Sequence, residues 1–441
     1  MKKLSIDSLV VGFALFAMFF GAGNIIFPPY VGLAAGPEWF LGYIFYYIAD
    51  VGLALVAIYA MLQANCIDRV EGIMFRLGGI PAKIMMGAVV ICLGPLLAVP
   101  RTCATTFSMA VVPFSGPDAL WLQILFSIIF FVAAFAFAIK ESKLVDIVGR
   151  YLTPLLVIGL LLMIAMGTAN PIGPISDAPK IDNVVWMGIS SGYQTLDVLA
   201  AMVFGLIVVN ALKAKGYNEP KLKFLSVAFA SIVAGILLLV VYGGLCYLGA
   251  TVSTMYPEDM DKGVLVVNIS NHIFGTTGGI ILSIVVGLAC LTTAVALIGA
   301  TGTFFSTLTH GKWSYTAVVS AVCVFSAIFA NVGLNNIISI AAPILTFIYP
   351  GALAVVFLSL FDKHIKNDNI FRFAAGGALA VSFCEVAGWY MPETFAFIKA
   401  LPFQGPGFGW VVPAVICGLI GIFVKAAPHE IPESDHLIDI E

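Results

Sequence analysis

The chain has 441 residues, of which 61% are hydrophobic and only 10% are charged, with a formal net charge of −3. Because a soluble globular domain carries about 25% charged residues, this composition places the chain among multi-pass membrane proteins, with the lipid bilayer as its surroundings. The sequence has no basic stripe, which argues against a nucleic-acid partner. No segment indicates an obligate protein partner.

The N-terminal stretch MKKLSIDSLVVGFALFAMFF has the basic start and the apolar run of a secretory signal peptide. Its apolar part is longer than the roughly 7–15 residues of a signal-peptide core, and no small-residue cleavage site follows it. The stretch therefore predicts a first membrane helix that is retained.

Apolar windows long enough to cross about 30 Å of hydrocarbon recur along the whole chain. They predict an all-α polytopic membrane protein with twelve transmembrane helices, at residues 8–34, 39–62, 83–112, 119–139, 145–168, 186–212, 222–249, 277–308, 313–330, 335–361, 371–391 and 408–426. Between the seventh and eighth windows, the stretch KGVLVVNISNHIFG has the pattern of an amphipathic helix on the outer face.

Lysine and arginine residues are concentrated in one alternate set of the connecting segments. That set holds seventeen of them, whereas the opposite set holds only Lys180, Lys262 and Lys399. Because cytoplasmic loops carry the excess of basic residues, we expect both termini in the cytoplasm. An odd number of spans would scramble this asymmetry, so the distribution also supports an even count.

Two of the predicted spans interrupt their own helical pattern. In the first span, GAGNIIFPP (21–29) predicts a break over residues 21–24, with the proline pair in about the first turn of a second half-helix. In the sixth span, a similar interruption of glycine and polar residues runs over residues 190–197. Backbone groups freed inside a membrane must face protein or a water-filled cavity, so both breaks are expected to line one.

The two interrupted spans occupy the same place in two five-helix halves, which indicates an inverted-repeat secondary transporter with its site at the breaks. The N-terminus of a half-helix carries partial positive charge and attracts a carboxylate, while freed carbonyls attract a cation or an ammonium group. An amino-acid zwitterion together with a small cation matches this field. Glycines that only permit close helix packing are the alternative interpretation.

The stretches GFALFAMFFGAGNIIFPP and GPLLAVPRT (94–102) resemble the bacterial branched-chain amino acid:cation symporters, the system II carriers, over nearly the whole chain. GAGNIIFPP is also similar to the motif of the sodium-coupled neurotransmitter transporters, which have the leucine-transporter fold of the amino acid/polyamine/cation superfamily. The resemblance implies a five-plus-five inverted repeat with discontinuous helices 1 and 6. The repeats would be residues 1–170 and 171–361, followed by two helices at 362–426 and a cytoplasmic tail at 427–441.

The same resemblance implies a sodium site between the first and eighth spans, where ACLTTA matches the eighth-span motif. Five oxygens without a full negative charge would suit Na⁺, by the oxygen-ligand preference of hard cations. They belong to the carbonyls of Ala17, Phe20 and Ala289 and to the hydroxyls of Thr292 and Thr293. From the residues alone, hydrogen bonding of the two threonines to their own helix is the alternative.

The substrate ligands that the resemblance implies are two amides for the carboxylate and three carbonyls for the ammonium group. The amides belong to Ala22 and Gly23, and the carbonyls to Phe19, Gln194 and Thr195. A second sodium site of this fold would include Asn24 and Thr195, but the seventh span lacks the asparagine that completes it. This second sodium is therefore in doubt.

Four ionisable residues fall inside the predicted spans, and each costs about 2.5–3.5 kcal/mol at a helix centre, so each needs a partner or a function. Asp197 directly follows the second break and is the best candidate to bind the ammonium group or a coupling proton. Arg101, on the third span, is expected to pair with Asp197 or to gate the outer vestibule. Asp50 and Glu385 are candidates for gating, for ion pairs or for purely structural roles.

By resemblance, the sequence predicts a symporter that imports leucine, isoleucine or valine with Na⁺ by alternating access, in a bacterial plasma membrane. Coupling to H⁺, or transport of another small amino acid on the same fold, stays open. A channel or a membrane enzyme is the alternative from another class. A channel would be expected to have a repeated filter, and the two unequal interrupted helices argue against one. The sequence has no P-loop, H-E-x-x-H or G-x-S-x-G motif, so an enzyme is not expected.

Overall fold

The computed structural model describes residues 9, 11–13, 15–16, 19–64, 66, 70–115, 120–139, 153–203 and 220–425. These residues are mostly helical, and no strand occurs among them. Eight of their helical segments are long and apolar enough to cross a membrane, and Val157–Ala169 and Val411–Phe423 are shorter apolar helices. The all-helical class is therefore confirmed, whereas the count of twelve spans and the repeat boundaries stay predictions.

The chain forms two compact units, each built from three separate stretches. The first unit comprises Met1–Val51, Ile91–Leu196 and Phe229–Ile340, and the second comprises Gly52–Val90, Asp197–Ala228 and Ala341–Glu441. Helices α13 (Pro220–Ala250) and α16 (Leu334–Ser359) contain residues of both units.

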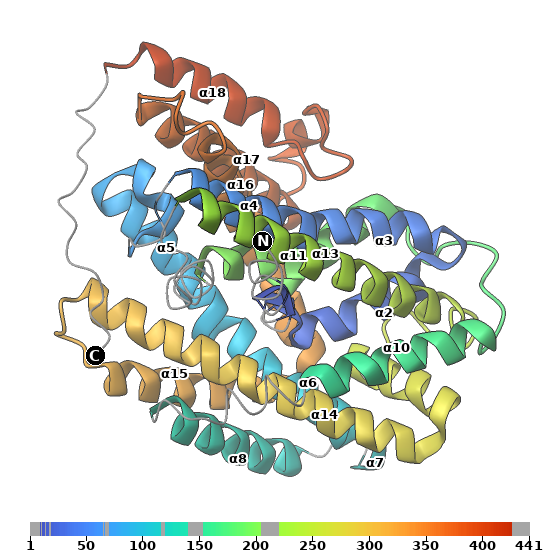
Figure 1. Cartoon of the computed structure of the whole chain (residues 1–441). Coiled ribbons are helices and arrows are strands. Elements are labelled where there is room, and N and C mark those ends of the chain that lie inside the picture. The colour runs from blue at the N-terminus through green and yellow to red at the C-terminus, as the bar shows by residue number, and fades with distance from the viewer. Residues whose placement is uncertain are drawn as a thin grey trace. The chain divides into compact units, whose positions relative to one another are not determined.

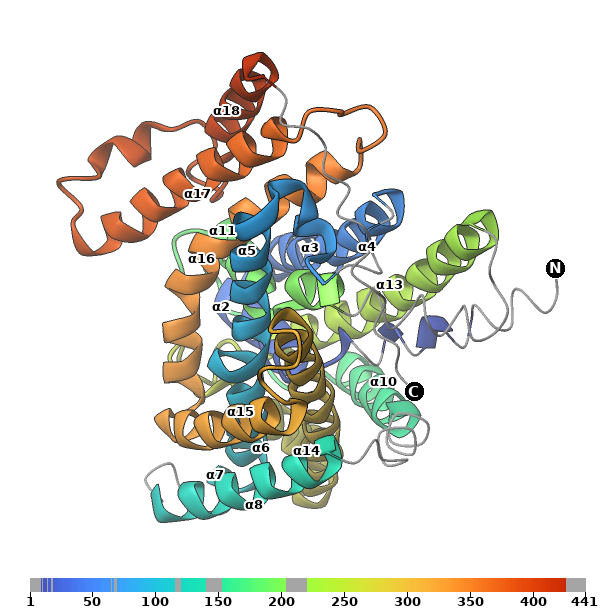
Figure 2. The ribbon, with the colours of Figure 1, turned by 90° about the vertical axis from the view of Figure 1, so that its left-hand side faces the viewer.

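Helix α14 (Lys262–Leu308) is the long central element of the first unit. It packs against most of the other helices of this unit (Figures 1 and 2), namely α2 (Ala22–Ala35), α6 (Ala98–Ala110), α8 (Leu120–Ile139), α10 (Thr153–Ala169) and α15 (Tyr315–Phe329). Short elements of this unit include η1 (Gly36–Glu38), α7 (Val112–Ser115) and η6 (Ala330–Val332), besides the π-helical segments η2 (Ile48–Gly52) and η4 (Cys92–Leu96) described below.

The expected amphipathic stretch KGVLVVNISNHIFG forms the first part of α14. Asp261 caps this helix by accepting hydrogen bonds from the amides of Gly263 (2.9 Å) and Val264 (3.0 Å), which supplies partners that the first turn otherwise lacks. Gly275 then bends the helix, because its φ of 72° is a left-handed conformation that favours glycine.

Small residues bring the backbones of the first unit very close together. A Cβ atom added to Gly32 of α2 would lie 1.8 Å from the carbonyl oxygen of Cys246 in α13, and one added to Gly249 would lie 1.9 Å from that of Pro29. Similarly, α11 (Val184–Thr195) packs on α3 (Trp39–Tyr47), where a Cβ on Gly188 would clash with the backbone. These glycines allow the close helix packing that membrane proteins use.

The second unit contains the other helical elements. They are α4 (Leu53–Gln63), η3 (Gly72–Leu77), α5 (Gly79–Ile91), a helical stretch at 197–203, α17 (Asn369–Tyr390), η7 (Ala396–Ala400) and α18 (Val411–Phe423). Helices α17 and α18 lie side by side in both views (Figures 1 and 2) and make the most extensive helix pair of this unit.

A buried arginine holds η3 to the connection before α17 within this unit. Arg76 is only 4% exposed, and its guanidinium lies 2.9 Å from Asp362 and 2.7 Å from Asp368. It also donates to the carbonyl of Ile365 and lies 4.4 Å from the ring centre of Phe371. Because the charge is buried, removing any one partner would leave the others without compensation.

Candidate functional site

The first span is interrupted at Phe20 and Gly21, and helix α2 begins at Ala22. The predicted interruption is therefore confirmed, but it lies slightly before the expected residues. Gly21 has an extended backbone (φ −109°, ψ −165°), and its amide donates to Oδ1 of Asn24 (3.2 Å), which fixes the start of the helix. The amides of Ala22 and Gly23 belong to the first turn, where helix geometry provides no intrahelical acceptor.

The proline pair lies deeper in α2 than the sequence predicted. Pro28 and Pro29 are inside the helix that begins at Ala22, beyond its first turn. Each proline lacks an N–H, so the carbonyls of Asn24 and Ile25 lose their usual intrahelical donors. The two prolines thus remove two intrahelical hydrogen bonds near the beginning of α2.

The second interruption is a single residue in the left-handed conformation. Helix α11 ends at Thr195, Leu196 has φ 73° and ψ 9°, and helical structure resumes at Asp197. The expected interruption over 190–197 was therefore too wide, because residues 190–195 continue the helix. A left-handed residue other than glycine costs roughly 1–2 kcal/mol, so the surrounding structure must hold Leu196 in place.

The two interruptions meet inside the first unit. A Cβ atom added to Gly23 would lie 3.1 Å from the Cα of Thr195 and 3.0 Å from Nη2 of Arg101. Such contacts are tighter than ordinary packing, so only glycine allows the start of α2 to approach the end of α11 this closely. The expectation that both interrupted helices share one location is confirmed for these residues.

Arg101 reaches this location from a third interruption, which the sequence analysis missed. The π-helical segment η4 (Cys92–Leu96) contains Pro95 and the non-helical Gly94 (φ −85°, ψ −114°), and α6 begins after it. Arg101 then donates hydrogen bonds to the carbonyls of Gln194 and Thr195, the latter at 3.0 Å. The adjacent Gly94 and Pro95 are the sequence signal that could have indicated this interruption. The expected pairing of Arg101 with Asp197, and its gating role, stay predictions.

Asp50 is a fully buried carboxylate (0% exposed) that connects both interruptions. It lies in the π-helical segment η2 (Ile48–Gly52), and it accepts hydrogen bonds from Oγ1 of Thr195 (2.8 Å) and Nδ2 of Asn24 (3.3 Å). Nδ2 of Asn24 also donates to the hydroxyl of Tyr242 in α13 (2.6 Å). Asn24 and Thr195, expected to share a second sodium site, therefore meet through Asp50. Nothing in the sequence pattern indicated Tyr242.

Thr293 of α14 lies near the first interruption. A Cβ placed on Gly21 would lie 3.6 Å from Cγ2 and 4.0 Å from Oγ1 of Thr293. The hydroxyls of Thr292 and Thr293 donate to the Ala289 carbonyl at 2.8 and 3.1 Å. Hydroxyl lone pairs remain able to accept while the proton is donated. Among the described residues, no group of three or more His, Cys, Asp or Glu side chains could hold a metal ion.

The remaining predicted site residues are distributed over both units. Phe19 is buried and precedes the first interruption, and Gln194 donates from Nε2 to the carbonyl of Ile338 (3.2 Å). Asp197 and Glu385 are buried residues of the second unit, and Glu385 accepts a hydrogen bond from Gln404 (3.1 Å). Ala17 lies outside the described residues, as does the predicted tail at 427–441.

This chain is all-helical, with apolar spans and two interrupted helices that meet at their ends, an arrangement known from membrane transporter folds. Solved structures of Mhp1, a nucleobase-cation-symport-1 family transporter with the leucine-transporter type of fold, share it. The closed conformation with bromovinylhydantoin bound gives a TM-score of 0.62 at 11% identity, over 94% of this chain and 91% of that one. The inward-facing conformation gives 0.63 at 12% identity, over 94% and 90%.

Sequence comparisons define the family within this architecture. Residues 4–428 match the family model described as branched-chain amino acid transport protein. The chain is 35% identical over 426 residues to the branched-chain amino acid permease BraB of Bacillus subtilis (strain 168), covering 94% of each chain. It is 32% identical over 439 residues to the permease BrnQ of Salmonella typhimurium (strain LT2), covering 98% of each. The chain therefore belongs to the branched-chain amino acid transport protein family, a family of transporters and not of enzymes.

Proposed function

We propose that this protein is a secondary active symporter that imports leucine, isoleucine or valine together with Na⁺ across a bacterial plasma membrane. The family match over residues 4–428 carries the substrate class. The close approach of the start of α2 to the end of α11 supports a carrier mechanism, because helix ends that meet inside a membrane form a polar site for a small solute.

The substrate would lie where these two helix ends meet. The amides of Ala22 and Gly23 belong to the first turn of α2, and their partial positive charge suits the carboxylate. The carbonyls of Phe19, Gln194 and Thr195 suit the ammonium group. Because Arg101 donates to the last two of these carbonyls, an arriving ammonium group would share them with Arg101 or displace it.

The coupling cation would bind between the first interruption and α14. The proximity of Thr293 to Gly21 supports this location, and the hydroxyls of Thr292 and Thr293 can each offer a lone pair. The Ala289 carbonyl and the carbonyls of Ala17 and Phe20 complete the oxygen set that we propose, which suits a monovalent hard cation.

Alternating access would link the two sites. Cation binding would stabilise the outward-open state, and the amino acid would then join the first and sixth spans. Movement of a bundle of spans 1, 2, 6 and 7 would next open the cytoplasmic side. The buried carboxylates Asp50 and Asp197 favour one variant of this scheme, in which H⁺ replaces Na⁺ as the coupling ion.

The decisive experiment uses purified protein in proteoliposomes. We expect radiolabelled leucine to accumulate when a Na⁺ gradient is imposed, and to be displaced by isoleucine and valine but not by charged amino acids. Accumulation with an H⁺ gradient alone would replace Na⁺ by H⁺ in the scheme. Counterflow of leucine distinguishes a carrier from a channel, because a channel supports no exchange against a gradient.

A further inference from the structure

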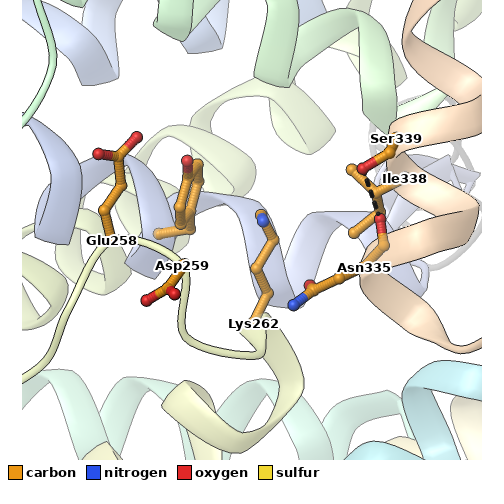
Figure 3. A pocket seen from close by; sticks show the side chains of 7 residues that line it. Glu258, Asp259, Lys262, Asn335, Ile338 and Ser339 are labelled. Atoms are coloured by element: carbon orange, nitrogen blue, oxygen red, sulfur yellow. Dashed lines mark hydrogen bonds between the residues drawn. The ribbon is translucent and has the colours of Figure 1, made fainter.

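A polar cavity of about 570 Å³, which is largely open to its surroundings, lies within the first unit, apart from the interruptions described above. It is lined by residues from three elements, namely Tyr30 of α2, Glu258, Asp259 and Lys262 around the start of α14, and Asn335, Ile338 and Ser339 of α16. Figure 3 shows Glu258 and Asp259 on one side of Lys262, and Asn335, Ile338 and Ser339 on the other. This volume is within the roughly 300–1,000 Å³ typical of small-molecule sites.

Lys262 occupies a position that ordinary helix electrostatics disfavour. It is the first residue of α14, where the helix dipole is positive and a cation is repelled. The neighbouring carboxylates of Asp261 and Glu258 partly offset this repulsion, and Asp261 also accepts from the amides of Gly263 and Val264. The ammonium group lies 4.0 Å from the ring centre of Tyr30. A residue that breaks a local preference in this way indicates a function beyond stability.

Acceptor groups line the other walls of the cavity. The carboxylates of Glu258 and Asp259 line the cavity, and Oδ1 of Asn335 is buried without a hydrogen-bond partner among the described residues. Leaving a buried acceptor without a partner costs about 1–3 kcal/mol, which a bound donor would remove. Donors and acceptors therefore converge here beside two apolar surfaces, the ring of Tyr30 and the side chain of Ile338.

The cavity adjoins both elements of the proposed transport site. Tyr30 belongs to the same helix as Gly23, and the main-chain carbonyl of Ile338 accepts a hydrogen bond from Gln194 (3.2 Å). A molecule in the cavity would thus contact α2 and a residue that holds the end of α11.

We infer that this cavity binds a zwitterionic amino acid separately from the site between α2 and α11. Lys262 binds the carboxylate, and Glu258 and Asp259, which lie together on one side of it, bind the ammonium group. The aliphatic side chain packs on Tyr30 and Ile338. The inference rests on the proposed function for its choice of ligand, and the basic-residue distribution places this cavity on the outer side.

Occupancy of the cavity can be measured with an introduced thiol. Ser339 is exposed and donates only to the Asn335 carbonyl of its own helix, so S339C should fold normally. We expect leucine to slow the reaction of this thiol with a membrane-impermeant methanethiosulfonate reagent. The protection should persist with G23V, since a side chain at Gly23 obstructs the contact between α2 and α11. The chain without S339C gives the background from Cys384 and Cys417, which are partly exposed.

The role of Lys262 is tested in the same assay and by kinetics. K262Q should abolish the protection, whereas K262R should retain it. In transport, K262Q should raise the leucine KM by about threefold to fivefold with an unchanged maximal rate, as expected for the loss of one partly exposed charge contact. The matched control is K399Q, which removes an exposed lysine of η7 predicted on the same side of the membrane.

Two results would overturn the inference. One is protection of the thiol that disappears with G23V, because leucine would then act only at the site between α2 and α11. The other is an unchanged leucine KM in K262Q. This kinetic test is independent of whether the S339C and G23V variants fold. Failure of the proposed function is distinct from both, because wild-type protein would then accumulate no leucine at all.

Discussion

A series of glycine-to-alanine substitutions tests the geometry at the two interrupted helices most directly. In Gly23→Ala, the new Cβ would lie 3.0 Å from Nη2 of Arg101 and 3.1 Å from the Cα of Thr195. The guanidinium is the far end of a flexible side chain and can move aside. The Cα of Thr195 is backbone, so α2 and α11 must separate by a few tenths of an ångström, which changes the distance between the proposed ligands.

Overpacking of this kind costs about 1–3 kcal/mol. To the extent that this cost is higher in the leucine-bound protein than in the free protein, the apparent leucine affinity falls, by about 5- to 150-fold for the full amount. Leucine uptake by proteoliposomes measures this, and thermal unfolding of the purified protein measures any loss of folding. We expect the unfolding temperature of Gly23→Ala to fall modestly, because the two tightened contacts already exist in the folded protein without substrate.

Two other glycines provide matched controls for this substitution. Gly376 of α17 has no neighbour within 4 Å of an added Cβ, so Gly376→Ala should keep the wild-type KM and stabilise the helix slightly. In Gly32→Ala the added Cβ would lie 1.8 Å from a carbonyl oxygen, so this variant should lose folded protein. A wild-type leucine KM in Gly23→Ala would refute the proposal that substrate binds between α2 and α11.

Three further outcomes are expected. Replacing Thr292 and Thr293 together by alanine should raise the Na⁺ concentration that gives half-maximal uptake, and unchanged Na⁺ dependence would count against that cation site. Thr195→Val removes the hydroxyl that donates to Asp50, so uptake should fall while Thr195→Ser retains most of it; equal rates for the two variants would show that the hydrogen bond is dispensable. Arg76→Met leaves the buried Asp368 and the partly exposed Asp362 without their cation, so the unfolding free energy should fall by about 3–5 kcal/mol, and an unshifted melting temperature would contradict that expectation.

Much of the helical framework could be predicted from the residues because its signals are local. Apolar length indicates a membrane span, and glycine beside polar residues marks a place where a helix opens. The same signals could not give the exact positions. Gly21 adopts the extended backbone while Asn24 caps the helix, which places the first interruption closer to the N-terminus than expected. Leu196 takes a left-handed conformation that no propensity favours.

The connections within the candidate site were harder to predict because they join distant segments. Thr195 and Asp50 are 145 residues apart, and Asn24 and Tyr242 are 218 residues apart. Such pairs depend on which faces of the helices pack together, and a single sequence carries no signal for that packing. Arg101 is an intermediate case, since the Gly-Pro pair before it indicated a bend but not its direction.

The reciprocal contacts of Gly32 with Cys246 and of Gly249 with Pro29 have a mechanical consequence. Because each main chain occupies the space where the other would carry a side chain, α2 can neither roll nor slide along α13 without a steric collision. The two helices are therefore rigidly coupled to each other. If α2 tilts in the proposed transport mechanism, α13 is expected to move with it as one body.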